Sequence, residues 1–225
     1  MRHLRDLHRG EDAYVLGSGA SLDYLDPAFF DGRLTIACNE VALRWRPTRY
    51  VVTKYHGLAH RAANLLPDAT VVVSRFQHGN RNEREAHGLP PNAAVFDHPH
   101  NQGDDFSAIT DWPNDPDQLV VSWSTITTAM HLAAHMGAAN IIIVGHDCGS
   151  LDGRSHVTGY PEPENRGQWL PYPDEAAWLA RIELDSIAVR ERLRDLYGVR
   201  TYSLSPFLNY GLEGVSYTRG ATVAV

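Results

Sequence analysis

Six short apolar runs, most of them followed by glycine or polar residues, constrain the fold of this chain most strongly. They lie at residues 13–17, 34–39, 49–56, 69–76, 140–145 and 199–206, and the run NIIIVG at 140–145 is rich in β-branched residues. Such residues favour strands, and near-continuous apolar runs are typical of parallel strands that are buried on both faces. We therefore predict an α/β fold on a mainly parallel sheet.

Two helical patterns support this fold class. A helix capped by Ser124 or Thr125 and stopped at Gly137 is predicted from its apolar positions, Ile126, Met130 and Ala133. A longer helix over about 175–197, ended by Gly198, carries the apolar stripe Leu179, Ile182, Val189, Leu193 and Leu196. Strands that alternate with helices indicate a single doubly wound, Rossmann-like sheet with helices on both faces.

The remaining segments and the composition set the organisation of the chain. At 225 residues the length fits one α/β domain over 1–225, with a loop-rich insertion at 77–118 and a polar segment at 149–174 that holds four prolines and four glycines. No apolar run approaches the roughly 20 residues that a membrane span needs. Two cysteines, Cys38 and Cys148, favour a cytoplasmic protein without disulfides, and the net charge of −7 gives no global attraction to nucleic acid.

Four strand ends are expected at the same edge of the sheet, because the carboxyl ends of parallel strands meet there and form the ligand crevice of open α/β folds. They are Gly17–Ser21, Asn39–Glu40, Lys54–His56 and Gly145–Asp147. The loop GSGAS lacks the third glycine of a dinucleotide fingerprint and the Gly-Lys-Ser/Thr of a Walker motif. Its small residues predict either a turn that exposes backbone N–H groups to a ligand or simply a tight strand-to-helix turn.

Three blocks of the sequence resemble one family. VLGSGASLDYLD with FDGRLTIACNE, STITTAMHLAAHMGAANIIIVGHD, and YGVRTYSLSP occur in the order found in the bacterial sialyltransferases of glycosyltransferase family 42. They are also similar to a wider group that includes hydroxymethylpterin pyrophosphokinases and motility-associated glycosyltransferases. The resemblance spans most of the chain outside residues 77–118. It implies a sialyltransferase-type fold and an inverting, metal-independent transfer of a sugar from a nucleotide-sugar donor, with a CMP-sugar favoured.

The resemblance also implies positions for the donor. The nucleotide would contact Gly17, Ser18, Gly19, Ser21 and Asn39, and the sugar would approach Ser124 and Thr125. The family usually has Asn where this chain has Ser18 and Pro where it has Ala20, which leaves the identity of the nucleotide open. A valine at Gly19 is accordingly expected to abolish nucleotide binding and to leave the melting temperature nearly unchanged.

Segment 149–174 corresponds to the family's lid, whose tyrosines reach the donor phosphate; Tyr160 and Tyr172 are the candidates here. The alternative is a surface loop whose tyrosines simply pack. The family places its basic histidine after the lid, but this chain has no histidine beyond His156. The general base is therefore assigned first to His156, with His146 and Asp174 as alternatives. Asp147 is expected to bind ribose, a sugar hydroxyl or magnesium.

No metal site or required cofactor is predicted. Asp115-Pro116-Asp117 is formally D-x-D but lies in a turn-rich stretch without a preceding strand, and His98-Pro99-His100 lacks further ligands at zinc spacing. Two other functions stay open: an ATP- and magnesium-dependent pyrophosphokinase of the pterin type, and a non-catalytic nucleotide-binding protein. The acceptor could be a glycan, a protein or a modified DNA base, and a homo-oligomer is possible.

Overall fold

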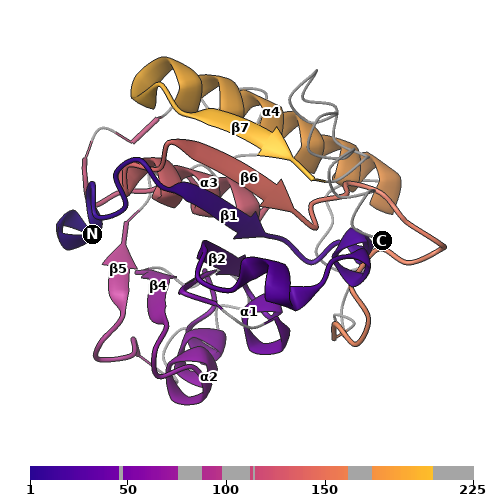
Figure 1. Cartoon of the computed structure of the whole chain (residues 1–225), viewed down its shortest axis with the longest axis horizontal. Helices are drawn as coiled ribbons and strands as arrows, with labels where there is room; N and C mark the ends of the chain where they lie inside the picture. The colour runs from indigo at the N-terminus through magenta and orange to yellow at the C-terminus, as the bar shows by residue number, and fades with distance from the viewer. Residues whose placement is uncertain (46–47, 76–87, 98–111, 114, 162–173, 205–225) are drawn as a thin grey trace.

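A single parallel sheet forms the centre of the chain (Figure 1). The computed structural model describes residues 1–45, 48–75, 88–97, 112–113, 115–161 and 174–204. All neighbouring strands in the sheet are parallel, and their order is β5-β4-β3-β2-β1-β6-β7. The strands are β1 (Asp12–Leu16), β2 (Leu34–Cys38), β3 (Tyr50–Thr53), β4 (Thr70–Ser74), β5 (Ala94–Phe96), β6 (Asn140–Val144) and β7 (Arg200–Ser203). This arrangement confirms the α/β class and is compatible with a Rossmann-like fold.

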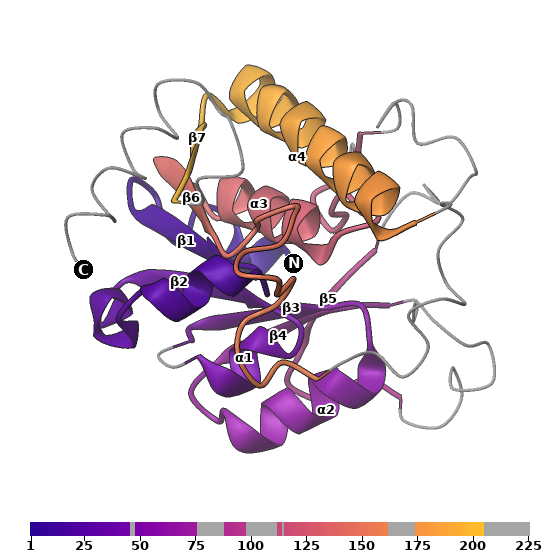
Figure 2. The same ribbon diagram turned by 90° about the vertical axis from the view of Figure 1, so that its right-hand side faces the viewer.

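Helices cover both faces of the sheet, as the view along it shows (Figure 2). One face carries α3 (Thr125–His135) and α4 (Glu175–Tyr197), together with η1 (Arg2–Leu4). The other carries α1 (Val41–Arg44), α2 (His56–Leu65), η2 (Ala20–Tyr24) and η3 (Pro27–Phe30). None of the helices in the described ranges has both the length and the apolar character that crossing a bilayer requires.

Two apolar layers hold these helices to the sheet. Because side chains alternate along a strand, Val15 faces the α3 side while Leu16 faces the α1 and α2 side. Ile143 and Val144 of β6 divide in the same way, and all four side chains are at most 1% exposed. Burial on both faces explains why these strands are apolar without interruption.

The predicted helix boundaries on the α3 and α4 side are confirmed. The Ser124 side chain caps α3 by accepting a hydrogen bond from the backbone N–H of Ile126 at 3.3 Å. Gly137 follows the helix with φ +84°, a left-handed conformation that favours glycine. Residues 175–197 form α4 as predicted, and Gly198 ends it with φ +68°.

Three details differ from the sequence prediction. The run 49–56 predicts one strand, but β3 ends at Thr53 and α2 begins at His56. The loop-rich range 77–118 contains β5, which extends the sheet by pairing with β4. Leu196, predicted to lie on the buried stripe of α4, is 51% exposed, and the buried apolar residues of that helix are Ile182, Val189 and Leu193.

The direction of the chain across the sheet changes between β1 and β6. From β1 the sequence proceeds outward through β5 on one side, and β6 and β7 then follow on the other side. Ligands of open α/β sheets bind at such a switch point, beyond the carboxyl ends of the strands. The loops after β1 and β6 therefore form the centre of the candidate site.

Candidate functional site

The loop after β1 is bonded directly to the loop after β6. The backbone N–H of Gly17 donates to the carbonyl of Val144 at 2.8 Å, and that of Gly19 donates to the carbonyl of Gly145 at 2.6 Å. A Cβ on Gly17 would collide with the carbonyl of Gly145. These two N–H groups thus bind the chain itself, which supports the tight-turn interpretation of the glycines.

Asp147 stabilises the same loop through two hydrogen bonds from Ser21. Its carboxylate is buried, with the residue 3% exposed, and it accepts hydrogen bonds from the backbone N–H of Ser21 at 2.8 Å and from the Ser21 hydroxyl. A Cβ on Gly19 would lie 2.6 Å from the carboxyl carbon of Asp147. A valine at Gly19 would therefore displace this carboxylate, contrary to the expectation that such a variant keeps its melting temperature.

Three predicted site residues come together over this loop. The Ser18 hydroxyl lies 3.4 Å from Nδ1 of His156, and the rings of His156 and Tyr160 are 4.8 Å apart between centroids. The backbone is joined here as well, because the N–H of Val157 donates to the carbonyl of Ser18 at 2.8 Å. Burial raises the pKa of Tyr160 to about 12, while a hydrogen bond with Ser18 acts in the opposite direction. The phenol therefore stays protonated and able to donate at neutral pH.

Residues 149–161, which we call the overlying segment, pass across the carboxyl ends of the strands (Figure 2). Gly159 comes so close to Arg44, at the end of α1, that an added Cβ would lie 3.0 Å from the guanidinium. Glu40 and Tyr55, which follow β2 and β3, also act to raise the pKa of the Tyr160 phenol. The overlying segment thus covers the ends of β1, β2 and β3. The predicted segment 149–174 continues into residues 162–173, including Tyr172, which lie outside the described residues.

Asp23 on η2 binds the overlying segment through hydrogen bonds and an ion pair, a set of contacts that we call the latch. It accepts hydrogen bonds from the backbone N–H of Thr158 at 3.0 Å, from the Thr158 hydroxyl at 2.8 Å and from Arg154. Burial acts to raise the pKa of Asp23, but the hydrogen bonds from Arg154 and Thr158 outweigh it and hold the pKa below the ordinary 3.8. The ionised carboxylate therefore stabilises the docked segment at neutral pH.

Removing this charge is expected to loosen the overlying segment. Because the pKa of Asp23 is lowered in the folded protein, its contribution is present above pH 3.8 and is lost as the pH falls through the lower folded value. Asp23→Asn mimics that loss at neutral pH and should speed amide exchange at Thr158 about 5-fold, as expected for a largely exposed ion pair. Asp31→Asn, at an exposed carboxylate at the end of η3, is the control. Equal exchange in both variants would contradict the latch.

His146 does not join His156. It is 7% exposed, and its Nε2 lies 2.6 Å from the hydroxyl of Ser186 on α4. That hydroxyl donates to the carbonyl of Ile182, so His146 donates to Ser186 through a protonated Nε2. Burial lowers the pKa of His146 to about 4. The ring is thus neutral and ties β6 to α4.

Asn39 connects β2 to the beginning of α3. It has φ +53°, a left-handed conformation that asparagine tolerates better than most residues. Its Nδ2 donates to the Thr125 hydroxyl at 3.2 Å. Its Oδ1 is buried and has no hydrogen-bond partner among the described residues. A buried amide oxygen without a donor is uncommon in a folded protein and is suited to accept from a ligand.

Lys54 is a site residue that the sequence interpretation places at a strand end but assigns no role. Its side chain is buried at the end of β3, and Nζ donates to the carbonyl of Ser122 at 3.0 Å, in the turn before α3. Lys54 is also the only lysine among the 20 lysine and arginine residues of the chain. The presence of a single lysine, placed at the end of a predicted strand, is visible in the sequence and could have marked Lys54 as a candidate site residue.

The other candidates have structural contacts away from this group. Asp174 is exposed and caps α4 by accepting from the N–H of Ala177 at 2.8 Å. The side chain of Asp115 accepts from the N–H of Asp117, and Asp117 pairs with Arg2 at 3.0 Å. His98 and His100 lie outside the described residues. Within the described ranges, no three acidic, histidine or cysteine side chains gather closely enough to hold a metal ion.

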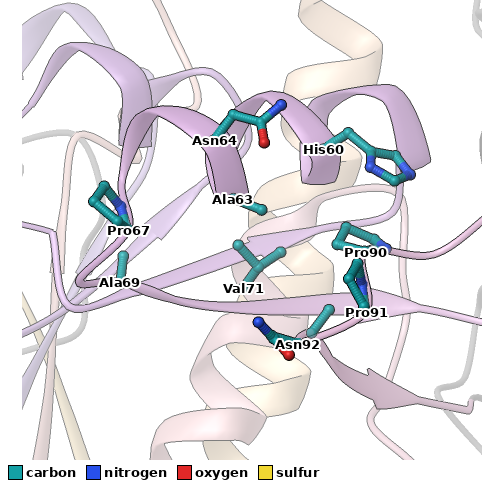
Figure 3. A pocket seen from close by; sticks show the side chains of 10 residues that line it. His60, Ala63, Asn64, Pro67, Ala69, Val71, Pro90, Pro91 and Asn92 are labelled. Atoms are coloured by element: carbon teal, nitrogen blue, oxygen red, sulfur yellow. The ribbon is translucent and has the colours of Figure 1, made fainter.

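A pocket elsewhere on the chain does not coincide with the crevice (Figure 3). It lies between α2 and the amino ends of β4 and β5, opposite the strand ends that carry the candidate site. Its lining is His60, Ala63, Asn64, Pro67, Ala69, Val71, Pro90, Pro91, Asn92 and Ala93. The predicted site residues therefore do not line this pocket.

Comparison with known proteins gave no match: no family model, curated protein or solved structure is significantly similar to the chain.

Proposed function

We propose that this protein is a glycosyltransferase that moves a sugar from a nucleotide-sugar donor to an acceptor hydroxyl, with inversion and without a metal. The observation that carries the proposal is the group formed by Ser18, His156 and Tyr160 beside the switch point. A histidine and a protonated phenol are the acid–base and hydrogen-bonding groups that this reaction requires. The motif resemblance to family 42 sialyltransferases favours a CMP-sugar as the donor.

His156 is the proposed general base. Its Nδ1 lies beside the Ser18 hydroxyl, and the imidazole would accept the proton of the acceptor hydroxyl as the new glycosidic bond forms. The electron pair of the breaking bond passes to the donor phosphate. Tyr160 is the proposed donor of a hydrogen bond to that phosphate, because its phenol is protonated at neutral pH.

Donor binding is proposed at the ends of β1 and β2 and at the start of α3. Ser18 and Asn39 would contact the nucleotide, and Ser124 and Thr125 would lie beside the sugar, with the positive end of the α3 dipole favouring an anionic donor. Gly17, Gly19 and Ser21 would contribute by shaping the loop, since their N–H groups are bonded within the chain.

A non-catalytic nucleotide-binding protein is the second candidate. It is favoured by the placement of two of the four predicted catalytic side chains, Asp147 and His146, in buried contacts with Ser21 and Ser186. A magnesium-dependent pyrophosphokinase receives less support. Asp147 is bonded to Ser21, and Glu40 is paired with Arg61 at 2.8 Å, so both carboxylates already have partners.

Thermal shift against CMP, UDP, GDP and ATP, each with and without magnesium, tests the proposal. We expect CMP without magnesium to raise the melting temperature by about 5–10 °C at 100 times its dissociation constant. CMP-sugar consumption would then identify an enzyme, whereas CMP binding without turnover of any donor would identify the second candidate. A shift with ATP only in the presence of magnesium would contradict the glycosyltransferase and favour the kinase.

A further inference from the structure

The buried ammonium of Lys54 lies at the carboxyl edge of the sheet. Lys54 follows the last residue of β3, and its side chain is directed to the α3 side of the sheet, where it contacts Ser122 in the turn before that helix. The residue is 5% exposed, and its Nζ reaches the carbonyl of Ser122 at 3.0 Å. An ammonium has three N–H donors, so this one contact does not satisfy the group.

The charge of Lys54 has no anionic partner within the described residues. The thiol of Cys38 acts on it, but burial raises the pKa of that thiol to about 12, so it carries no charge at neutral pH. No carboxylate of the described ranges lies within ion-pair distance of Nζ. Burial lowers the pKa of Lys54 itself to about 8. A buried cation without a counter-ion destabilises a fold, so it is retained at a cost.

The surroundings of Lys54 are suited to an anion. Ser122 lies in the turn before α3, so the ammonium approaches the positive end of an 11-residue helix. Asn39, at the end of the neighbouring strand, is bonded to Thr125 in the first turn of the same helix. Its buried Oδ1 has no donor among the described residues. The edge thus offers a cation for an anionic oxygen and an acceptor for a hydroxyl or amino group.

We infer that Lys54 is an anion anchor: its ammonium binds a phosphate-class oxygen of the ligand, while Oδ1 of Asn39 accepts a hydrogen from the same molecule. The ligand class is a phosphorylated sugar or nucleotide that carries a free hydroxyl or amino group near its phosphate. This inference rests on the proposed function in taking this edge as the substrate site, and it assigns the donor phosphate to Lys54 in addition to Tyr160.

The single lysine permits a direct test. In protein labelled with carbon-13 lysine, the Cε signal reports the protonation of Lys54 alone. Pyrophosphate and CMP should raise the pKa of Lys54 and move this signal, and cytidine, which lacks the phosphate, should not. Lys54→Met should weaken CMP binding about 10- to 100-fold and leave cytidine binding unchanged. Arg61→Met removes a 59% exposed cation near the same edge and is the matched control, with less than a 3-fold change expected.

The outcomes separate this inference from the proposed function. A shift of the Lys54 signal with pyrophosphate, in a protein that binds no nucleotide-sugar, would support the anchor and contradict the glycosyltransferase. Nucleotide-sugar binding that leaves the Lys54 signal unchanged and is unaffected by Lys54→Met would overturn the anchor alone. A signal that no anion moves would also overturn it.

Discussion

Replacing Gly19 with alanine is expected to lower the free energy of unfolding by about 3 kcal/mol. The new Cβ would lie 2.6 Å from the carboxyl carbon of Asp147, and the carboxylate would have to move. That movement breaks its hydrogen bonds with the N–H and hydroxyl of Ser21, which leaves a charged group buried with fewer partners. Urea denaturation of the variant and the natural protein measures the difference.

Gly57→Ala is the matched control. A Cβ on Gly57 would meet nothing within 4 Å, and the residue lies in the first turn of α2. Alanine there should stabilise the protein by up to about 1 kcal/mol, because it restricts the unfolded chain and favours the helix. Equal stability of the two glycine variants would contradict the prediction that the close packing of Gly19 against Asp147 contributes to the free energy of unfolding.

Replacing His156 with alanine is expected to lower turnover about 100-fold or more while the affinity for the donor changes little. A general base acts in the transition state, so its loss affects the chemical step rather than ground-state binding. Tyr160→Phe should reduce turnover less, because the other groups around the phosphate remain. Steady-state kinetics with the donor found by thermal shift, together with donor binding by calorimetry, separates the two effects.

His60→Ala serves as the control for His156, because His60 lines the pocket on the opposite edge of the sheet (Figure 3). Its activity should equal that of the natural protein. Full activity in His156→Ala would assign proton transfer to another group, with Asp174 the next to substitute because His146 is buried and neutral. Activity lost on treatment with EDTA would instead indicate a metal-dependent enzyme.

The sequence predicted the fold best where local signals and tertiary packing agree. The bounds of α4 follow from a long pattern with Asp174 at its start and Gly198 at its end, both visible in the sequence. β5 has three residues in a turn-rich stretch and forms because β4 offers an edge, so its signal is tertiary rather than local. The sequence prediction missed α2, although its buried residues Leu58, Ala59 and Ala62 have helical spacing, because the predicted strand 49–56 extended to the first residue of this helix.

For the site, the sequence predicted the positions better than the contacts. The convergence of strand ends follows from parallel topology, which the alternating pattern indicates. The bond between Ser21 and Asp147 joins residues 126 positions apart, and that between Ser18 and His156 joins residues 138 apart. No local pattern encodes such pairs. The burial of Lys54 also depends on tertiary structure, because the turn before α3 packs against it. In the sequence alone, Lys54 is only a cationic residue that follows a predicted strand.

The position of β1 between β2 and β6 also affects how the protein folds during its synthesis. β1 and β2 lie close in sequence, but Asp12 of β1 bonds with Asn140 of β6, 128 positions later. At about 5–20 residues per second, synthesis of the stretch from Phe96 to Asn140 lasts several seconds. During that time strands β1 to β5 can associate, and the apolar edge of β1 is left without its second neighbour. An open edge strand is a template for pairing with other chains, so the nascent protein is most exposed to aggregation just before β6 leaves the ribosome.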